Sequence, residues 1–243
     1  MKIKFLGTSH GRAEVNRYCT SYMITHNGKN YIIDVGAPVE YLLTNSGITL
    51  DKISAFFITH MHCDHASELP TIIKNFVHYN KGKTTIFMPD KNAIEPLLAW
   101  SQALGENRQT VLEHITFNVT YEGVIYNENG LTVTAIKTEH LGTLPSFAFM
   151  LETSDNKRVL FTGDLATNHR DFPKIAYEKE FDLIVSEFAH FADEPEFNSM
   201  KTVNSKQIIL AHLGAKHIAK LNELKPEFAC PYLIASDGLE YTL

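Results

Sequence analysis

Long hydrophobic runs are absent from this 243-residue sequence, which contains no apolar segment long enough to cross a bilayer or to form the core of a signal peptide. Cysteine is scarce as well. The three residues Cys19, Cys63 and Cys230 are scattered, which excludes a disulfide framework and favours a reducing compartment. The chain also lacks internal repeats, low-complexity tracts and Gly/Ser linkers. We therefore expect a cytoplasmic protein that does not associate with membranes and forms a single domain over residues 1–243.

Basic residues are fewer than acidic residues in this sequence. The sequence has 22 Lys and Arg against 28 Asp and Glu, a formal net charge of -6 at pH 7, and no run of basic residues. A protein that grips a long polyanion needs clustered cations, because phosphate contacts supply most of the non-specific affinity for nucleic acid. The composition therefore disfavours a large nucleic acid as the binding partner.

Short apolar strands alternate with helical patterns along the chain, which is typical of an α/β fold. Predicted helices cover residues 39–45, 67–79, 90–104 and 214–224. Predicted strands cover residues 3–6, 21–25, 31–35, 53–59, 84–88, 115–119, 131–137, 147–152, 158–162, 181–185 and 207–211, followed by an extended segment at 232–243. The continuous apolar run at 53–59 indicates a strand that is covered on both faces.

Histidine is the residue in excess, with 12 in the chain, and the densest cluster is the run HMHCDH at residues 60–65. Imidazole and carboxylate groups suit zinc and related divalent metals. His60 and His62 project the same way from an extended backbone, whereas Asp64 and His65 lie past the bend and can serve a neighbouring ion. The run therefore predicts a site for two adjacent metals, and the alternative is a histidine-rich surface loop that binds nothing.

The same run resembles the HxHxDH signature of the metallo-β-lactamase superfamily. The other markers of that superfamily are present in the expected order. Four lie at the ends of predicted strands, at residues 32–36 with Asp34, 139–140, 161–164 and 210–212, and residues 234–238 resemble the usual closing strand. The resemblance extends over residues 3–243. It implies an α/β fold built as a four-layer αββα sandwich, in which two mixed sheets are flanked by helices and two divalent metal ions lie at one sheet edge.

The resemblance also implies which residues bind these ions. The implied ligands are His60, His62 and His140 for the first ion, Asp64, His65 and His212 for the second, and Asp164 as a bridge together with a water or hydroxide. Asp34 would orient one of the ligands or the loop around it. Zinc is the expected metal, although manganese and iron accept the same ligands.

Within the superfamily, the segments at 7–9, 145–149 and 182–187 resemble the ribonuclease Z and small cyclic-phosphodiesterase branch. The sequence lacks two features of ribonuclease Z, a separate proton-handling histidine segment and a long basic arm that grips transfer RNA. His190 could replace the missing proton donor, with Glu187 orienting it, or it could simply cap its loop. The expected catalytic residues are therefore Asp64, Glu187 and His190.

These observations predict a dinuclear metal-dependent hydrolase that cleaves a small phosphodiester, cyclic ones included, through a metal-bridging hydroxide. A net positive metal centre favours a small anionic substrate, and the family suggests a homodimer. One rival hypothesis is a lactonase or other ester hydrolase, whose apolar pocket Phe147, Phe149, Phe188 and Phe191 could build. A second is ribonuclease Z-like RNA 3′ processing, and a third is a metal-binding module without hydrolytic activity.

Two smaller expectations concern the remaining histidines. His10 is expected to line the mouth of the site. The histidines expected only at surface or helix positions are His26, His78, His114, His169 and His217.

Overall fold

The computed structural model describes residues 1–80, 82–140, 142–190 and 198–243, and within these residues the strands form two seven-stranded sheets. In sheet order, the first sheet consists of β14 (Glu240–Thr242), β1 (Lys2–Gly7), β2 (Ser21–His26), β3 (Lys29–Ile33), β4 (Ile53–Phe57), β5 (Thr84–Met88) and β6 (Ile115–Val119). The second consists of β13 (Tyr232–Ile234), β12 (Ile208–Ala211), β11 (Leu183–Glu187), β10 (Arg158–Phe161), β9 (Ser146–Thr153), β8 (Leu131–Thr138) and β7 (Gly123–Glu128).

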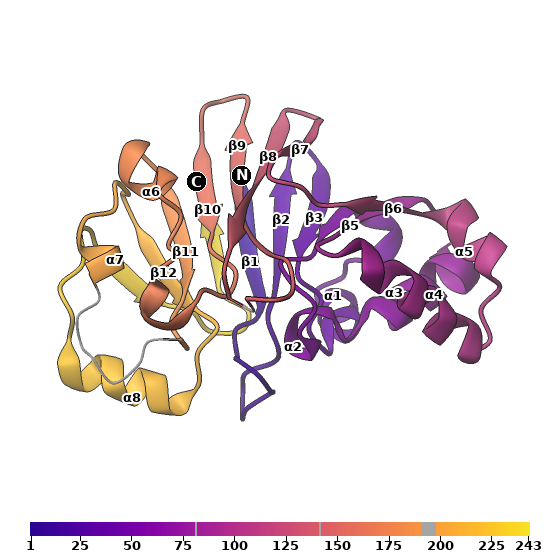
Figure 1. Ribbon diagram of the computed structural model, residues 1–243, viewed down its shortest axis with the longest axis horizontal. Coiled ribbons are helices and arrows are strands. Elements are labelled where there is room, and N and C mark those ends of the chain that lie inside the picture. The colour runs from indigo at the N-terminus through magenta and orange to yellow at the C-terminus, as the bar shows by residue number, and fades with distance from the viewer. Residues whose placement is uncertain (81, 141, 191–197) are drawn as a thin grey trace.

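Helices cover the outer faces of both sheets, with α3, α4 and α5 on one side and α6, α7 and α8 on the other (Figure 1). The helices beside the first sheet are α1 (Val39–Asn45), α2 (Cys63–Ala66), α3 (Leu69–Asn75), α4 (Ile94–Ala103) and α5 (Arg108–His114). Those beside the second are α6 (Ile175–Glu178), α7 (Asn198–Lys201) and α8 (Ala215–Leu224). Each sheet combines parallel and antiparallel pairs. The predicted αββα sandwich with two mixed sheets is confirmed.

The layers follow from where the apolar side chains lie. One buried cluster fills the space between the sheets, where Phe57 stacks on Phe87 with ring centroids 4.9 Å apart and contacts Phe149 of the opposite sheet. A second cluster joins the first sheet to its helices through residues such as Ile72. A third joins the second sheet to its helices through residues such as Leu221. Strands covered on both faces read as continuous apolar runs, which makes them visible in the sequence.

Strand direction brings the chemistry to one edge. β4 runs parallel to its neighbours in the first sheet, and β10, β11 and β12 run parallel to one another in the second. β8 is antiparallel to β9, which is antiparallel to β10, so that β8 and β10 share one direction. The loops that leave the carboxyl ends of these strands carry the polar motifs of the sequence, as is usual in sheets with parallel strands.

Several elements differ from the prediction, which lacks α5, β7 and the short helices α2, α6 and α7. β7 lies at the edge of its sheet and is largely exposed, so it shows no buried face in the sequence. The predicted strands at 31–35 and 53–59 each end two residues early, and the first does so because Asp34 has a positive φ of 58°. The predicted helix at 67–79 is divided into α3 and a π-helical turn at Phe76–Asn80.

No helix within the described residues has both the length and the apolar character needed to span a membrane. Nothing in the structure tests the predicted single domain, and that remains a prediction.

Phe57→Ala should destabilise the sandwich by about 3–5 kcal/mol, because it leaves a cavity between two sheets that close around an aromatic cluster. Chemical denaturation followed by circular dichroism measures the loss. Val124→Ala is the matched control, since Val124 is 49% exposed and its truncation should change stability by less than about 0.5 kcal/mol. Equal losses in the two variants would contradict a core centred on Phe57.

Candidate metal centre

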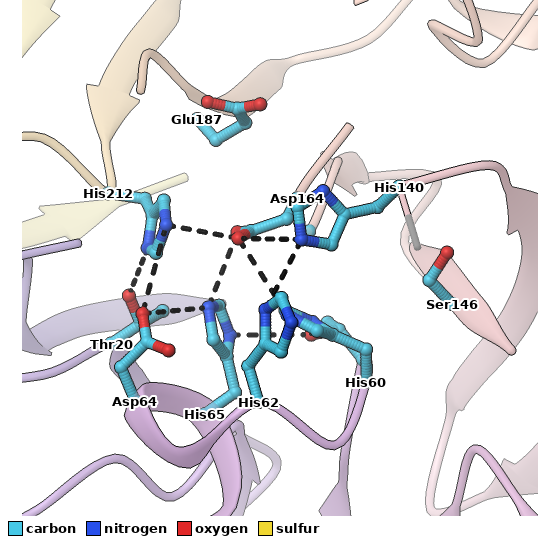
Figure 2. Close-up of polar contacts among 12 residues, drawn as sticks. Thr20, His60, His62, Asp64, His65, His140, Ser146, Asp164, Glu187 and His212 are labelled. Atoms are coloured by element: carbon cyan, nitrogen blue, oxygen red, sulfur yellow. Dashed lines mark hydrogen bonds and ion pairs between the residues drawn. The ribbon is translucent and has the colours of Figure 1, made fainter. Parts of the chain in front are cut away.

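All the predicted metal ligands meet at one point between the ends of the two sheets (Figure 2). The loop after β4 and helix α2 contribute His60, His62, Asp64 and His65, and the strand ends of the second sheet contribute His140, Asp164 and His212. They form two neighbouring groups, and within each group the potential ligand atoms lie within 4.8 Å of one another. The structure therefore brings together side chains that are up to 152 positions apart (212 − 60).

The first group consists of His60, His62, His140 and Asp164. Asp164 Oδ2 lies 3.7 Å from His60 Nε2 and 3.6 Å from His140 Nε2. His140 Nε2 lies 3.3 Å from His62 Nδ1. These atoms face a common centre, as expected for side chains that can share one ion.

The second group consists of Asp64, His65 and His212, with Asp164 beside it. His65 Nε2 lies 3.5 Å from Asp64 Oδ2 and 3.3 Å from Asp164 Oδ1. His212 Nε2 lies 3.1 Å from Asp164 Oδ2 and 3.9 Å from Asp64 Oδ2. Asp164 thus borders both groups and is placed where a bridging carboxylate would lie.

In four of the five predicted ligand histidines, the nitrogen that points away from the centre has a partner of its own, which fixes the orientation of the ring. These contacts are His65 Nδ1 with Asp34 Oδ2 at 2.7 Å, His212 Nδ1 with Thr20 Oγ1 at 2.7 Å, His60 Nδ1 with Thr59 Oγ1 at 3.0 Å, and His140 Nδ1 with the carbonyl oxygen of Leu165 at 3.1 Å. Asp34 therefore lies behind His65, one of the predicted ligand histidines, and is placed where it can orient that ring.

The centre also has the chemistry that a divalent metal requires. Within the described part of the chain, the buried atoms His60 Nε2, His65 Nε2 and Asp164 Oδ1 make no hydrogen bond. Buried polar atoms without partners are costly, and a cation between them would satisfy them. Burial lowers the pKa of His60 well below its usual value, which keeps the ring neutral and able to ligate. Burial opposes ionisation of Asp164, but His212 and His65 hold its pKa well below the usual range.

A carboxylate and a further histidine border the cluster. Glu187, at the end of β11, is buried, and its Oε2 accepts hydrogen bonds from the backbone N–H groups of Ala189 and His190. Its Oε1 lies 2.9 Å from His190 Nδ1. The His190 ring centroid lies 4.6 Å from that of His140 and 6.0 Å from that of His212. Burial opposes protonation of His190, but the hydrogen bond and charge of Glu187 raise its pKa to about 9.

His10 lies beside the centre, as expected. Its ring centroid is 5.9 Å from that of His212 and 4.6 Å from that of His217. The backbone N–H of the next residue, Gly11, donates a hydrogen bond of 2.6 Å to Asp64 Oδ2. The loop that carries His10 thus orients one of the predicted ligands.

The sequence does not reveal the role of His169 in this arrangement. The prediction gives His169 a surface or helix position, and the structure places it in the 3-10 helix Thr167–His169. The side chain is nevertheless only 2% exposed, and its Nε2 lies 3.3 Å from Glu187 Oε1. For His26 the prediction of a surface or helix position is wrong, because this residue is 6% exposed within strand β2. A helix of three residues is too short to show a periodic pattern that would indicate burial, so only the folded chain shows the contact with Glu187.

The apolar acyl pocket of a rival ester hydrolase finds no support in the described residues. Phe147 and Phe149 pack between the two sheets, and Phe188 packs in the cluster behind the second sheet. Phe191 lies outside the described residues. The three described phenylalanines form the core rather than the wall of a substrate pocket.

Comparison with known proteins identifies relatives of this chain. The family model described as anti-Pycsar protein Apyc1 matches residues 1–217. Among curated proteins, ribonuclease Z of Halalkalibacterium halodurans is 25% identical over 173 residues, which cover 68% of this chain and 53% of that protein. Ribonuclease Z of Staphylococcus epidermidis is 29% identical over 163 residues, which cover 63% of this chain and 49% of that protein. The chain therefore aligns with about half the length of these relatives.

Solved structures share the fold over the whole chain. The metallo-β-lactamase fold protein YhfI from Bacillus subtilis has a TM-score of 0.79 and 19% identity, with 99% of each chain covered. The short form of human tRNase Z has a TM-score of 0.77 and 17% identity, with 100% of this chain and 99% of that chain covered. These comparisons confirm the predicted resemblance to the metallo-β-lactamase superfamily and to its ribonuclease Z branch.

Two metal ions per chain are the expected stoichiometry, because the ligand atoms are too numerous for one tetrahedral ion. Elemental analysis after equilibration with zinc and removal of free metal should approach two ions per chain. His212→Ala should lower this value by about one, whereas His78→Ala, whose side chain is 53% exposed and belongs to none of the clustered groups, should not change it. A reproducible value of one in the unmodified protein, with no gain on adding metal, would contradict two sites.

Proposed function

The chain belongs to the family of anti-Pycsar protein Apyc1, whose model matches most of its length, and from this premise we propose that it is a metal-dependent phosphodiesterase acting on small substrates. The observation that carries the proposal is the position of His190. This residue is anchored by Glu187, and its ligand-type nitrogen lies within 4.8 Å of ligand atoms of Asp164 and His212, two members of the candidate metal centre. A metal centre with an adjacent proton donor is suited to the cleavage of a phosphate ester.

We propose that the residues implied by the sequence are the ligands. The first ion would be held by His60, His62 and His140, the second by Asp64, His65 and His212, and Asp164 would be shared. When bound, such ions polarise a phosphoryl oxygen and lower the pKa of a bound water. Zinc, manganese and iron all accept this set of nitrogen and oxygen donors.

His190 would supply the proton for the leaving oxygen. Its Nδ1 is engaged by Glu187, which leaves Nε2 as the nitrogen that can meet a substrate. Because the pKa of His190 is raised to about 9, the ring carries a proton at neutral pH. A protonated imidazole within reach of an alkoxide leaving group is a suitable general acid. Glu187 keeps the ring in one orientation and stays ionised, since His169 and His190 together outweigh burial and lower its pKa.

The proposed substrate is a small phosphodiester, such as a cyclic nucleotide or a cyclic ribose phosphate. A chain with a net charge of -6 offers little attraction to a large polyanion, so the positive charge that meets the phosphate should come mainly from bound cations. A cytoplasmic location agrees with this substrate class and with the scarcity of cysteine.

Ribonuclease Z-like RNA processing is the second candidate, and the curated relatives favour it. The aligned residues make up about half of those proteins, so the activity of the whole relatives is only a proposal for this chain. The complete set of predicted ligands argues against a metal-binding module without activity.

His190→Ala should lower kcat about 10²- to 10⁴-fold on a phosphodiester with an alkoxide leaving group and only slightly on bis-p-nitrophenyl phosphate. The reason is that p-nitrophenolate leaves without a proton, whereas an alkoxide needs one. Steady-state kinetics on both substrates with the zinc enzyme measures the difference, and His78→Ala serves as the control. If both substrates lost the same factor, His190 would serve to position groups or to support the fold instead.

Salt dependence separates the two candidate substrates. A small substrate held at one phosphate should show a shallow fall of kcat/KM with salt, whereas a folded RNA should show roughly 0.7 to 0.9 log units per phosphate contact per decade of salt. Kinetics with a cyclic nucleotide between about 50 and 500 mM salt, with precursor transfer RNA as a competitor, measures both. Efficient cleavage of the precursor at its 3′ trailer would replace the small-phosphodiester proposal with ribonuclease Z activity.

A further inference from the structure

Glu187 is a buried carboxylate surrounded by donors from several segments. Leu165 N–H donates to its Oε1 at 3.2 Å, and the same oxygen accepts from His190 Nδ1. The backbone N–H groups of Ala189 and His190 donate to Oε2 at 2.6 and 3.0 Å. His169 approaches Oε1 as well, with its Nε2 at 3.3 Å. Two imidazoles therefore contact one oxygen of this carboxylate, and His190 is the one that borders the metal centre.

The backbone next to His169 connects the segment after β10 to the proton donor. Asn168 N–H donates to the carbonyl oxygen of His190 at 2.9 Å. The carbonyl oxygen of Leu165 accepts from His140 Nδ1, while the N–H of the same residue donates to Glu187. The segment that begins at the predicted bridging residue thus contacts a ligand histidine, the buried carboxylate and the proton donor.

The conformation of this segment places His169 inside the protein. Asn168 and His169 have φ values of 62° and 53°, in the left-handed region that residues other than glycine adopt infrequently. Such a conformation persists only where its surroundings stabilise it, and it is frequent at functional sites. His169 is also packed against Phe172, with ring centroids 6.0 Å apart. Its imidazole is therefore held toward Glu187 by both backbone and packing.

We propose that His169 is a positioning residue, which restrains the Glu187 carboxylate so that His190 keeps the orientation needed to protonate a leaving oxygen. This inference rests on the proposed function, because it assigns a support to the proposed proton donor. The side chain of Glu187 has torsions that can rotate its carboxylate away from His190, and the contact with His169 restricts them. In this role His169 acts through Glu187 rather than on the substrate.

The test compares two replacements of His169. In His169→Asn the side chain is too short to reach Glu187, although asparagine tolerates the left-handed backbone. In His169→Gln the amide nitrogen can reach the position of Nε2. We expect His169→Asn to lower kcat about 10- to 100-fold on a phosphodiester with an alkoxide leaving group, with KM and metal content unchanged and bis-p-nitrophenyl phosphate affected less than about threefold. His169→Gln should recover most of the loss.

A spectroscopic measurement tests the same inference without turnover. In the zinc-loaded protein, the Nδ1 proton of His190 that is hydrogen-bonded to Glu187 should give a downfield proton resonance. His169→Asn should broaden or remove this resonance, and His169→Gln should retain it. His26→Asn, a change at a buried histidine in β2, controls for a general loss of stability, and thermal unfolding is recorded for every variant.

The outcomes are distinct. A folded His169→Asn variant that keeps the His190 resonance, or that loses activity equally on both substrates, would overturn the positioning role. If His169→Asn does not fold, a His169→Gln variant that folds but lacks the resonance would overturn it as well. If the unmodified protein cleaves no phosphodiester, the proposed function fails, while the resonance still decides whether His169 holds Glu187 and His190 together.

Discussion

The burial of the Asp164 carboxylate is the constraint on which the site depends. This group is 3% exposed, and a charge in that position is stable only when opposite charge surrounds it. Nitrogen atoms of His60, His65, His140 and His212 lie 3.1 to 3.7 Å from its oxygens. Burial opposes protonation of His65, but Asp164 and Asp34 hold its pKa well above the usual value. The centre therefore attracts positive charge, whether as protons or as metal ions.

The direction of the strands places the histidines around this carboxylate. A carboxylate and several imidazoles can be brought together without bending the chain sharply, because strands of both sheets end at the same edge. The apolar interior supplies the rigidity. Phe57 and Phe161 are the last residues of β4 and β10, and both pack between the sheets directly before the polar loops. Residues at the strand ends then fix the rings through further contacts, such as that of Thr20, just before β2, with His212. A rigid scaffold with polar strand ends is the usual arrangement for a metal-dependent active site.

The sequence predicts most features that are formed by neighbouring residues and few of the contacts between residues that are far apart in the chain. The run at 60–65 is visible because its ligand-type residues are adjacent, and the fold is visible because strands covered on both faces read as apolar runs. Glu187 and His190 can be suspected from their proximity in sequence, but their hydrogen bond requires the structure. The contact between His169 and Glu187 joins a short 3-10 helix to the end of β11, and no periodic pattern relates the two residues, so no feature of the sequence could indicate it. The single domain, the homodimer and the number of metal ions remain predictions.

The ligands of each proposed ion come from both sheets. His60, His62, Asp64 and His65 follow a strand of the first sheet, whereas His140, Asp164 and His212 follow strands of the second. An ion bound there would act as a cross-link between the two halves of the sandwich. By mass action, a ligand that binds only the folded state stabilises it by RT ln(1 + [L]/Kd), or about 2.7 kcal/mol at a hundredfold excess over Kd. The supply of metal would then set the stability of the folded protein as well as its catalytic capacity.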